Sequence, residues 1–433
     1  MASEDRHSVS WPTKRIGDFA SVKGGKRLPA GTSLTSKRTN HPYIRIVDFK
    51  DGRVDKTNLL FVPDDVFPRI SRYTISANDL YISIVGTIGL VGAIDQGLEG
   101  ANLTENAAKI CDINDCVDRE YLLAYLRSHL GQQQIKALTV GSTQPKLALY
   151  RIEDILVPCP PVEEQRAIAQ ILGVLDDKIE LNRKMNETLE AMARALFKSW
   201  FVDFAPVRAK AEGRNTGLPD AIAALFPASF EEAETGSIPT GWSVCGLDEI
   251  ARFLNGLALQ KFPPMDGRSL PVIKIAQLRT EDTKSADQAS ADLANDYIVE
   301  DGDVLFSWSG SLTCILWAGG RGALNQHLFK VTSSSYPKWF YWLWILQHLA
   351  EFQSIAADKA TTMGHIQRRH LSEAKVFLPP TALIEEASKH FAPIVDQIIG
   401  LKVEAKSLVA TRDALLPKLI SGEIRLNGNG EEA

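Results

Sequence analysis

Two groups of residues in this chain have types and spacings that could do chemistry. Gly86, Gly89 and Gly92 follow a β-branched run, where phosphate-binding glycines often lie. Their spacing differs from the dinucleotide-binding fingerprint, and another strand is predicted after them, so we interpret them as tight turns. His365 and His370 are five positions apart and would not share a helix face as metal ligands. We therefore predict no metal site and no bound cofactor in the chain itself.

The sequence also lacks the common catalytic motifs. It contains no Gly-x-x-x-x-Gly-Lys-[Ser/Thr] loop, no Gly-x-Ser-x-Gly elbow and no His-Glu-x-x-His pair. It has no Asn/Asp-Pro-Pro-aromatic tetrapeptide, with which an adenine methyltransferase would hold the amino group of a flipped base. Cys111 and Cys116 have no second cysteine pair nearby to complete a zinc site, and five cysteines in all fit reduced thiols in a cytosol. We expect a binding subunit, not a catalyst.

The elements that must position any functional residue come from an internal duplication. Residues 129–201 match residues 348–420 at a constant shift of 219 positions, which brings one Pro-Pro pair onto the other. Nearer the N-terminus the shift grows, to 231 where Trp11 meets Trp242. The part of the chain with the constant shift has a helical pattern, and the part in which the shift changes is rich in turn residues. We therefore predict a repeated rod that carries two diverged heads.

Each head is predicted to be a mixed β structure with helices. Short β-branched runs bounded by turn residues indicate strands. The predicted strands are residues 43–47, 80–85, 107–111, 272–275 and 304–307. A helix is predicted after each set of strands, at about residues 118–137 and 338–357, and a last strand ends at each proline pair.

Beyond each proline pair the apolar residues recur at helical spacing. The stripe consists of Ile168, Leu172, Leu175, Ile179, Leu189 and Leu196 in the first copy, and of Phe391, Ile394, Ile398, Leu401, Leu408 and Leu415 in the second. Such a stripe marks a long amphipathic helix. At 1.5 Å per residue, about 40 residues from Val162 to Phe201 would span roughly 60 Å. A helix of this length cannot bury its own stripe, so we predict that the two copies pair as an antiparallel coiled coil.

Asn182 interrupts the first stripe at the position where Leu401 continues the second. One interpretation is a polar residue tolerated near the helix surface. The other is a polar position that fixes the register of the pair at a cost in stability. We favour the first interpretation.

Composition narrows the class of protein. Apolar residues make up 45% of the chain, with 8 Trp and 17 Phe, so both halves should be globular. A net charge of −5 argues against a protein that grips nucleic acid alone through a large basic surface, but permits DNA binding beside a basic partner. Residues 1–15 lack the apolar run of a signal peptide, and the apolar run 339–346 is shorter than the ~20 residues that cross a bilayer. We expect a cytoplasmic protein with no membrane partner.

Several segments resemble one known family. Residues 415–425, Leu-Leu-Pro-Lys-Leu-Ile-Ser-Gly-Glu-Ile-Arg, resemble the C-terminal signature of the specificity subunits of Type I restriction–modification enzymes. Residues 196–204, followed by 206–210, resemble their central conserved region. Residues 158–165, Pro-Cys-Pro-Pro-Val-Glu-Glu-Gln, resemble their step from recognition domain to helix. The resemblance extends over nearly the whole chain.

The resemblance implies a non-catalytic subunit with two target-recognition domains, each reading one half of a bipartite, asymmetric site in double-stranded DNA. It implies that two conserved helices pair as a spacer between them. Two modification subunits, which bind S-adenosylmethionine and methylate adenine, are expected to dock on this subunit. Restriction subunits, which translocate and cleave DNA with ATP and Mg, are expected to join them.

The sequence departs from the family pattern at two places. Ala205 stands where the family usually has Asp, before Pro206. Residues 381–384, Thr-Ala-Leu-Ile, follow the second proline pair in place of a Glu-Gln step. Either change could alter docking on a modification subunit.

With the resemblance, we divide the chain into six parts. They are recognition domain 1 (1–161), a long spacer helix (162–203), a connector (204–241), recognition domain 2 (242–380), a second spacer helix (381–426) and a disordered tail (427–433). The predicted fold class is α+β, with two pseudo-symmetric domains separated by the paired helices.

Base readout needs Arg or Lys for guanine, Asn or Gln for adenine, and adaptable Ser or Thr donors on loops that can enter a groove. The candidates in the first domain are Lys23, Lys26, Arg27, Arg69, Arg72, Ser142, Thr143, Gln144 and Lys146. The candidates in the second domain are Gln260, Lys261, Ser309, Ser311, His365, Gln367, Arg368 and Arg369. We rank highest the segments ending in Lys146 and in Arg369, because we expect both to lie at equivalent places before the rods. The alternative is a coiled-coil assembly scaffold whose heads bind proteins instead of DNA.

Overall fold

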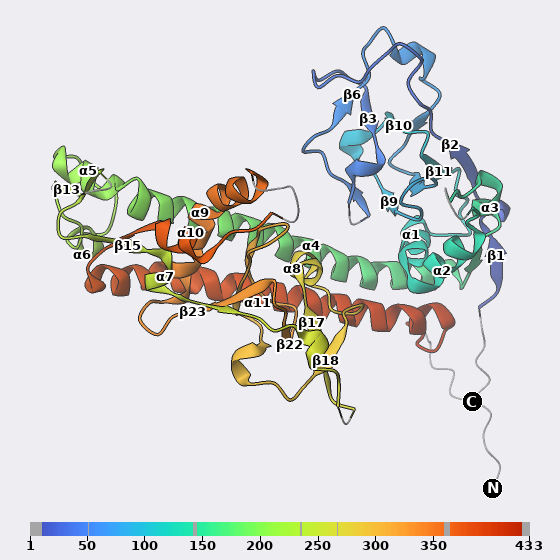
Figure 1. Cartoon of the computed structure of the whole chain (residues 1–433). Coiled ribbons are helices and arrows are strands. Elements are labelled where there is room, and N and C mark those ends of the chain that lie inside the picture. Colours follow the sequence, from blue (N-terminus) through green and yellow to red (C-terminus); the bar gives the residue numbers. More distant parts are fainter. Residues whose placement is uncertain are drawn as a thin grey trace. The chain divides into compact units, whose positions relative to one another are not determined.

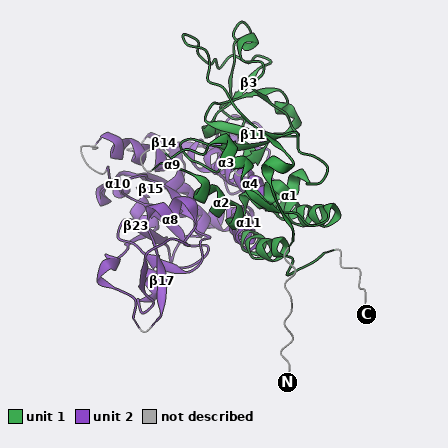
Figure 2. Ribbon diagram, turned by 90° about the vertical axis from the view of Figure 1, so that its right-hand side faces the viewer, with its two compact units in different colours: residues 1–178, 408–433 green, residues 179–407 purple. Residues whose placement is uncertain are grey.

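The computed structural model describes residues 11–50, 52–141, 145–233, 236–265, 267–358 and 364–426. The chain forms two compact units, one of residues 1–178 and 408–433 and one of residues 179–407 (Figure 2). The predictions for residues 142–144 and for the tail at 427–433 concern residues outside the described ranges.

The head of the first unit, from β1 to β12, contains two four-stranded sheets (Figure 1). One has the order β2-β11-β8-β9 and is antiparallel throughout. Its strands are β2 Ser21–Gly24, β8 Leu80–Ser83, β9 Val91–Ala93 and β11 Ala107–Cys111. The other has the order β6-β3-β10-β7, in which β3 and β10 are parallel. Its strands are β3 Pro42–Ile44, β6 Leu60–Phe61, β7 Thr74–Ile75 and β10 Ala101–Leu103.

Helices and short strand pairs complete the first head. Strand β1 Thr13–Arg15 pairs with β12 Leu156–Pro158, and β4 Phe49–Lys50 pairs with β5 Arg53–Val54. The helices are α1 Arg119–Arg127, α2 His129–Leu138 and α3 Leu149–Glu153. Strand β8 is covered on both faces, because Leu80 and Ile82 lie in one apolar cluster and Tyr81 in another. This explains its short, continuous apolar run.

The head of the second unit, from β15 to β24, repeats this topology. The antiparallel sheet β16-β23-β20-β21 consists of β16 Arg252–Asn255, β20 Val304–Ser307, β21 Cys314–Leu316 and β23 Leu328–Thr332. The mixed sheet β18-β17-β22-β19 consists of β17 Ser269–Ile273, β18 Gln288–Ser290, β19 Ile298–Val299 and β22 Gly322–Leu324. Strands β17 and β22 are its parallel pair. The closing pair is β15 Ser243–Gly246 with β24 Lys375–Leu378, and the helices are α7 Leu247–Ile250, α8 Ile275–Thr280, α9 Lys338–Asp358 and α10 Arg368–Glu373.

The predicted single helix over residues 118–137 is wrong. The chain breaks at Ser128, which has extended backbone angles and whose Oγ accepts a hydrogen bond from the Gly131 N–H (3.1 Å). A Cβ on Gly131 would lie 2.3 Å from the Tyr125 carbonyl oxygen, so glycine allows the second helix to begin this close to the first. In the second head the helix is continuous as α9.

Three predicted strands end earlier than expected, and the predicted connector is folded. The strand predicted at 80–85 ends at Ser83. Ile46 belongs to a 3-10 turn and Ile275 begins α8, so neither extends its strand. Residues 204–241 contain α5 Ala205–Ala211, α6 Asp220–Ala223 and the hairpin of β13 Phe230–Ala233 with β14 Gly236–Pro239. Phe204, Ile222 and Phe226 are buried in the core of the second unit, which gives this segment more order than its Gly- and Pro-rich composition suggests.

The long helices are α4 Val162–Phe197 and α11 Thr381–Ser421, and each contributes to both units. In the first unit Arg412 Nη1 lies 2.7 Å from Asp176 Oδ1, and the Leu426 N–H donates to Glu164 Oε1 (2.7 Å). A later position on α11, or just beyond its end, therefore meets an earlier position on α4, as an antiparallel pair requires.

In the second unit the same two helices are again antiparallel. Asn182 Nδ2 donates to Glu404 Oε2 (2.7 Å), and the rings of Phe197 and Phe391 are 6.4 Å apart. After Phe197 a π-helical turn, Lys198–Val202, places Trp200 against Phe391 (5.6 Å between ring centroids). The predicted helix over 162–201 therefore changes its winding before its end.

All residues of the predicted stripe are buried or half-buried. Ile168, Leu172, Phe391, Ile398 and Leu401 are buried. Half-buried members are Leu175, Ile179, Leu189, Leu196, Ile394, Leu408 and Leu415. Asn182 is 0% exposed, so our preferred interpretation of it as a tolerated residue near the helix surface is wrong. Among the described helices, none combines the length and apolar character needed to cross a membrane.

Candidate nucleic-acid interface

In the first head a turn joins β10 of the mixed sheet to β11 of the antiparallel sheet. The Lys26 N–H donates to the Leu103 carbonyl (2.9 Å), and the Ala107 N–H donates to the Thr104 carbonyl (3.1 Å). Thr104 Oγ1 accepts from the Asn106 N–H (3.4 Å). We call this the β10–β11 turn. These bonds leave the side chains of residues 105 and 106, both half-buried, at its tip.

The second head contains the same turn between β22 and β23. The Leu257 N–H donates to the Leu324 carbonyl (3.0 Å), and the Leu328 N–H donates to the Asn325 carbonyl (3.0 Å). Asn325 Oδ1 accepts from the His327 N–H (3.2 Å), as Thr104 does for its neighbour in the first head. We call this the β22–β23 turn.

In each head, a glycine allows the neighbouring loop to pack closely against the turn. A Cβ on Gly25 would lie 2.0 Å from the Thr104 carbonyl oxygen, and a Cβ on Gly256 would lie 2.2 Å from that of Asn325. No side chain tolerates such a distance. The segments that follow Gly25 and Gly256 therefore start from equivalent places.

A second loop, after β8 or β20, is held by a buried serine in each head. Ser83 Oγ accepts from the Leu90 N–H (2.8 Å), and Ser307 Oγ accepts from the Thr313 N–H (2.8 Å). Both serines are 0% exposed.

Each second loop also forms a one-residue β-bridge to the segment that precedes α3 or α10. Val85 forms this bridge with Lys146 in the first head, and Ser309 forms it with His365 in the second. The loop after β8 or β20 thus meets the segment before the last short helix in the same way in each head.

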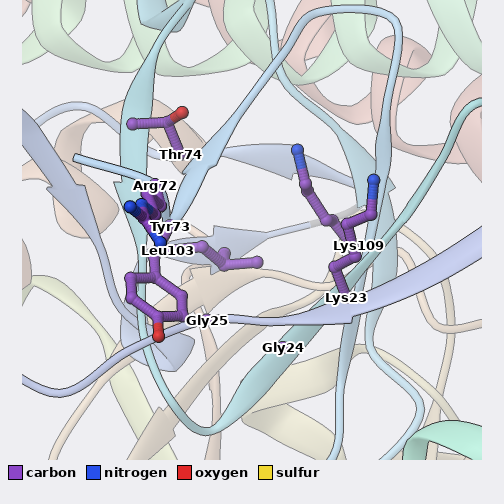
Figure 3. Close-up of a pocket in the computed structure, with 8 residues that line it drawn as sticks. All are labelled: Lys23, Gly24, Gly25, Arg72, Tyr73, Thr74, Leu103 and Lys109. Atoms are coloured by element: carbon purple, nitrogen blue, oxygen red, sulfur yellow. The ribbon is translucent and has the colours of Figure 1, made fainter. Parts of the chain in front are cut away.

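A pocket of about 390 Å³ opens beside the β10–β11 turn (Figure 3). Lys23 and Lys109 project from one side of it, and Arg72 and Tyr73 lie on the other. Leu103, which begins the turn, also lines the pocket. This arrangement suits an anionic group such as a phosphate.

Carboxylates hold the two lysines of this pocket. Lys23 Nζ lies 2.8 Å from Asp112 Oδ2, and this hydrogen bond raises the pKa of Lys23 and lowers the pKa of Asp112. Lys109 Nζ lies 2.9 Å from Asp79 Oδ2. Both lysines thus have defined positions at the wall of the pocket.

Comparisons with known proteins show to which family the chain belongs. The model of the Type I restriction modification DNA specificity domain matches residues 8–191 and 239–404. The chain belongs to this family of specificity subunits. It is 26% identical over 324 residues to the MjaIX specificity subunit of Methanocaldococcus jannaschii, covering 72% of this chain and 70% of that protein. It is 24% identical over 420 residues to the HindI specificity subunit of Haemophilus influenzae, covering 86% and 87%.

The fold agrees with a solved specificity subunit. The crystal structure of the S subunit from M. genitalium matches with a TM-score of 0.56 at 16% identity, over 96% of this chain and 98% of that one. The two heads of this specificity subunit are accordingly its two target-recognition domains.

In recognition domain 1 the predicted residues gather at the β10–β11 turn and the pocket. Arg27 Nε lies 2.6 Å from Glu105 Oε1, with the Arg27 side chain 79% exposed. Burial alone would raise the pKa of Glu105, but the hydrogen bond from Arg27 brings it below its ordinary value. Lys26 Nζ lies over the Tyr73 ring at 5.6 Å from its centroid.

Other predicted residues of domain 1 have varied settings. Arg69, Arg72 and Lys146 are exposed. Ser142, Thr143 and Gln144 lie outside the described residues. The roles of all these residues in DNA binding remain predictions.

In recognition domain 2 the predicted residues divide by exposure. Gln260 and Lys261 are exposed on a 3-10 turn, and Ser311 is exposed on the loop after β20. Ser309 is 4% exposed, and its Oγ lies 3.1 Å from His327 Nδ1, so it is placed to orient another side chain. His365 is half-buried, with its ring 6.4 Å from that of Trp308.

The segments ending in Lys146 and Arg369 lie at equivalent places, but their predicted ends are out of register by four positions. The bridges show that Lys146 of the first segment corresponds to His365, which comes before Gln367 in the second segment. Arg368 and Arg369 instead begin α10. Arg368 Nη2 donates to the Phe253 carbonyl (3.3 Å), a contact that ties it to the domain.

The sequence alone did not lead to the residues at the tips of the two turns. These are Glu105 and Asn106 in domain 1, and Gln326 and His327 in domain 2. A usable signal was the shift of the duplication at β11 and β23, which aligns the two turns. Within the described ranges, no group of three or more His, Cys, Asp or Glu side chains could hold a metal ion.

Proposed function

We propose that each recognition domain reads one half of a bipartite, asymmetric DNA site. The observation that carries this proposal is the repeated frame of turns and loops, which presents different side chains in the two domains. Glycine, serine and backbone bonds recur at equivalent positions, whereas the residues that they hold differ. Two domains that share one backbone frame but present different side chains are suited to recognise two different half-sites.

We propose further that the paired helices set the separation of the half-sites and carry the modification subunits. Support comes from apolar side chains that the helix pair does not cover. In the first unit Ile171 and Val174 of α4 are exposed, and in the second unit Leu181, Met185 and Met192 are. Their spacing of three, four and seven positions is that of a second helical stripe. An exposed apolar stripe is a typical protein-binding surface.

Catalysis belongs, in this proposal, to the partner subunits. S-adenosylmethionine would bind to the modification subunits, and ATP and Mg to the restriction subunits. Ala205 and residues 381–384, which depart from the family pattern, lie at the start of α5 and of α11. They are therefore the first positions to vary in a docking assay.

The test is methylation mapping. The full chain should be produced with its modification subunits in a host without other adenine methylation, and methylated adenines should be mapped by sequencing. A split motif with two unlike halves is expected. Methylation without a split motif would contradict the proposal, as would sequence-independent binding to DNA in the assembled complex. The latter result would favour heads that bind proteins.

A further inference from the structure

We infer that the tips of the two repeated turns distinguish the two half-sites. In domain 1, bases are read by Asn106 and by the Arg27 guanidinium that Glu105 holds, and in domain 2 they are read by Gln326 and His327. This inference rests on the proposed reading of one half-site by each domain. It goes further because it assigns the residues that make the two readings different.

The first step is that the four side chains at the tips start from equivalent backbone positions. The same three hydrogen bonds close each turn. One comes from the neighbouring loop, one joins two backbone groups within the turn, and one is accepted by the side chain of Thr104 or Asn325. Each turn is also anchored to the parallel strand: the Thr104 N–H donates to the Ile44 carbonyl (3.1 Å) and the Asn325 N–H to the Ile273 carbonyl (3.3 Å). A change of side chain at the tip therefore changes chemistry without moving the frame.

The second step concerns the chemistry at the tip of domain 1. Glu105 accepts from Arg27, from Thr104 Oγ1 (3.1 Å) and from Tyr43 Oη (3.4 Å), so its carboxylate has a defined direction. The bond to Arg27 uses Nε, which leaves the Nη groups of this exposed guanidinium to bond O6 and N7 of a guanine. Asn106 beside it has the donor and acceptor that pair with adenine.

The third step concerns domain 2, where the same positions carry an amide and an imidazole. His327 Nδ1 lies 3.1 Å from Ser309 Oγ, and its ring lies 5.8 Å from that of Trp308. Gln326 Nε2 lies 3.4 Å from His327 Nε2. Trp308 is itself held by Nε1 donating to Asn255 Oδ1 (2.9 Å). These contacts orient two side chains able both to donate to and to accept from a base edge.

The fourth step is the neighbouring pocket of domain 1. Lys23 and Arg72 line it together with Leu103, the first residue of the β10–β11 turn. Phosphate contacts position a protein on DNA, and base contacts beside them give sequence preference. Lys23 and Lys109 are each paired with a carboxylate, so the exposed Arg72 guanidinium is the group of this pocket best placed to meet a phosphate next to the tip.

The experiment uses the full complex with the modification subunits and maps the methylated motif for two variants. The double variant Gln326→Ala/His327→Ala should relax only the half-site of domain 2. The variant Arg27→Ala should relax only the half-site of domain 1. In competition binding, each should lower the preference for its own half-site by about 10-fold while the other half-site is unchanged. Matched controls are Gln288→Ala, on β18 of domain 2, and Arg15→Ala, on β1 of domain 1, whose guanidinium pairs with Asp154.

The outcomes separate this inference from the proposed function. An unchanged motif in both variants, with wild-type complex still methylating a split motif, would overturn the inference alone. Lack of a split motif in the wild type would overturn the proposed function. If a variant methylates nothing, binding to the target and to random DNA is compared: selective loss of target binding supports the inference, and equal loss of both, or a lowered unfolding midpoint, overturns it.

Discussion

At Gly25 and Gly256 the backbone passes so close to a neighbouring carbonyl oxygen that a single methyl group has no room. Neither glycine has a left-handed backbone conformation, so the requirement is one of space and not of torsion angle. The two positions are equivalent in the duplicated heads. The same steric constraint therefore fixes the loop beside each tip.

Gly25→Ala and Gly256→Ala should each destabilise one recognition domain by about 1–3 kcal/mol, because the Cβ forces the loop away from the turn. Thermal unfolding of the purified chain measures this. In methylation mapping each variant should impair only the half-site of its own domain.

The matched control is Gly173→Ala on α4, where an added Cβ meets nothing within 4 Å. This change should leave stability unchanged or raise it by about 1 kcal/mol, because alanine favours a helix. An equal loss of stability in the control and in Gly25→Ala would contradict the steric explanation.

At the scale of the elements, the long helices combine an apolar stripe with one buried polar position. Asn182 is fully buried and donates to Glu404, while Asn182 Oδ1 has no hydrogen-bond partner. A buried amide with one unmatched acceptor costs stability. Its bond to one particular residue of α11 favours a single register, which is the known role of polar residues in such stripes.

Asn182→Leu should therefore raise the unfolding midpoint and weaken the choice of register. Amide hydrogen exchange over residues 179–197 and 391–407 should then show more than one population. Thr188→Leu, which adds a similar side chain at an exposed position of the same helix, serves as control. A lower midpoint in Asn182→Leu, with the control unchanged, would show that the amide stabilises the pair.

Glu180 on α4 predicts a dependence of stability on pH. Its hydrogen bond from Arg183 lowers the pKa of Glu180 from 4.5 to about 2. A carboxyl group with a lowered folded pKa stabilises the fold above its unfolded value, and this stabilisation is lost as the pH falls from about 4.5 to about 2. Glu180→Gln should therefore lower the unfolding midpoint at pH 7, by an amount equivalent to about 1 kcal/mol or less.

The difference between wild type and Glu180→Gln should shrink through this pH window and vanish near pH 2. The control Glu190→Gln removes a more exposed carboxylate, paired with Arg194 on the same helix. A difference that stays constant from pH 7 to pH 2.5 would mean that the ionised carboxylate is not the cause.

At the scale of the whole molecule, the duplication joins two kinds of repeat. The helices repeat at a constant shift of 219 positions, which keeps their stripes in phase over both units. The heads repeat their strand order but not their loop lengths. Such a difference between helices and heads would arise if evolution kept the length of a spacer constant while the two recognition domains varied.

Insertion of seven residues after Glu187 and of seven after Gly400 tests the spacer. A heptad keeps the stripe in phase and adds about 10 Å, so the gap between half-sites should grow by about three base pairs. Methylation mapping measures the gap. Insertion in one helix alone should abolish methylation, and an unchanged gap after the paired insertion would refute the spacer role.

The sequence was sufficient for features that depend on near neighbours. The stripe of the long helices, the strands at 107–111 and 304–307 and the duplication were all predicted, because helical and strand periodicities repeat within a few residues. The α+β class and the family followed from them and from short motifs.

Contacts between residues distant in the chain came only from the tertiary structure. Arg27 meets Glu105 across 78 positions, Asn182 meets Glu404 across 222, and Ser309 is buried against His327. The break at Ser128 likewise depends on how closely two helices pack at Gly131. Side-chain packing decides such contacts, and local periodicity carries no information about it. The strands and helices of the heads could therefore largely be predicted, whereas the contacts between their side chains could not.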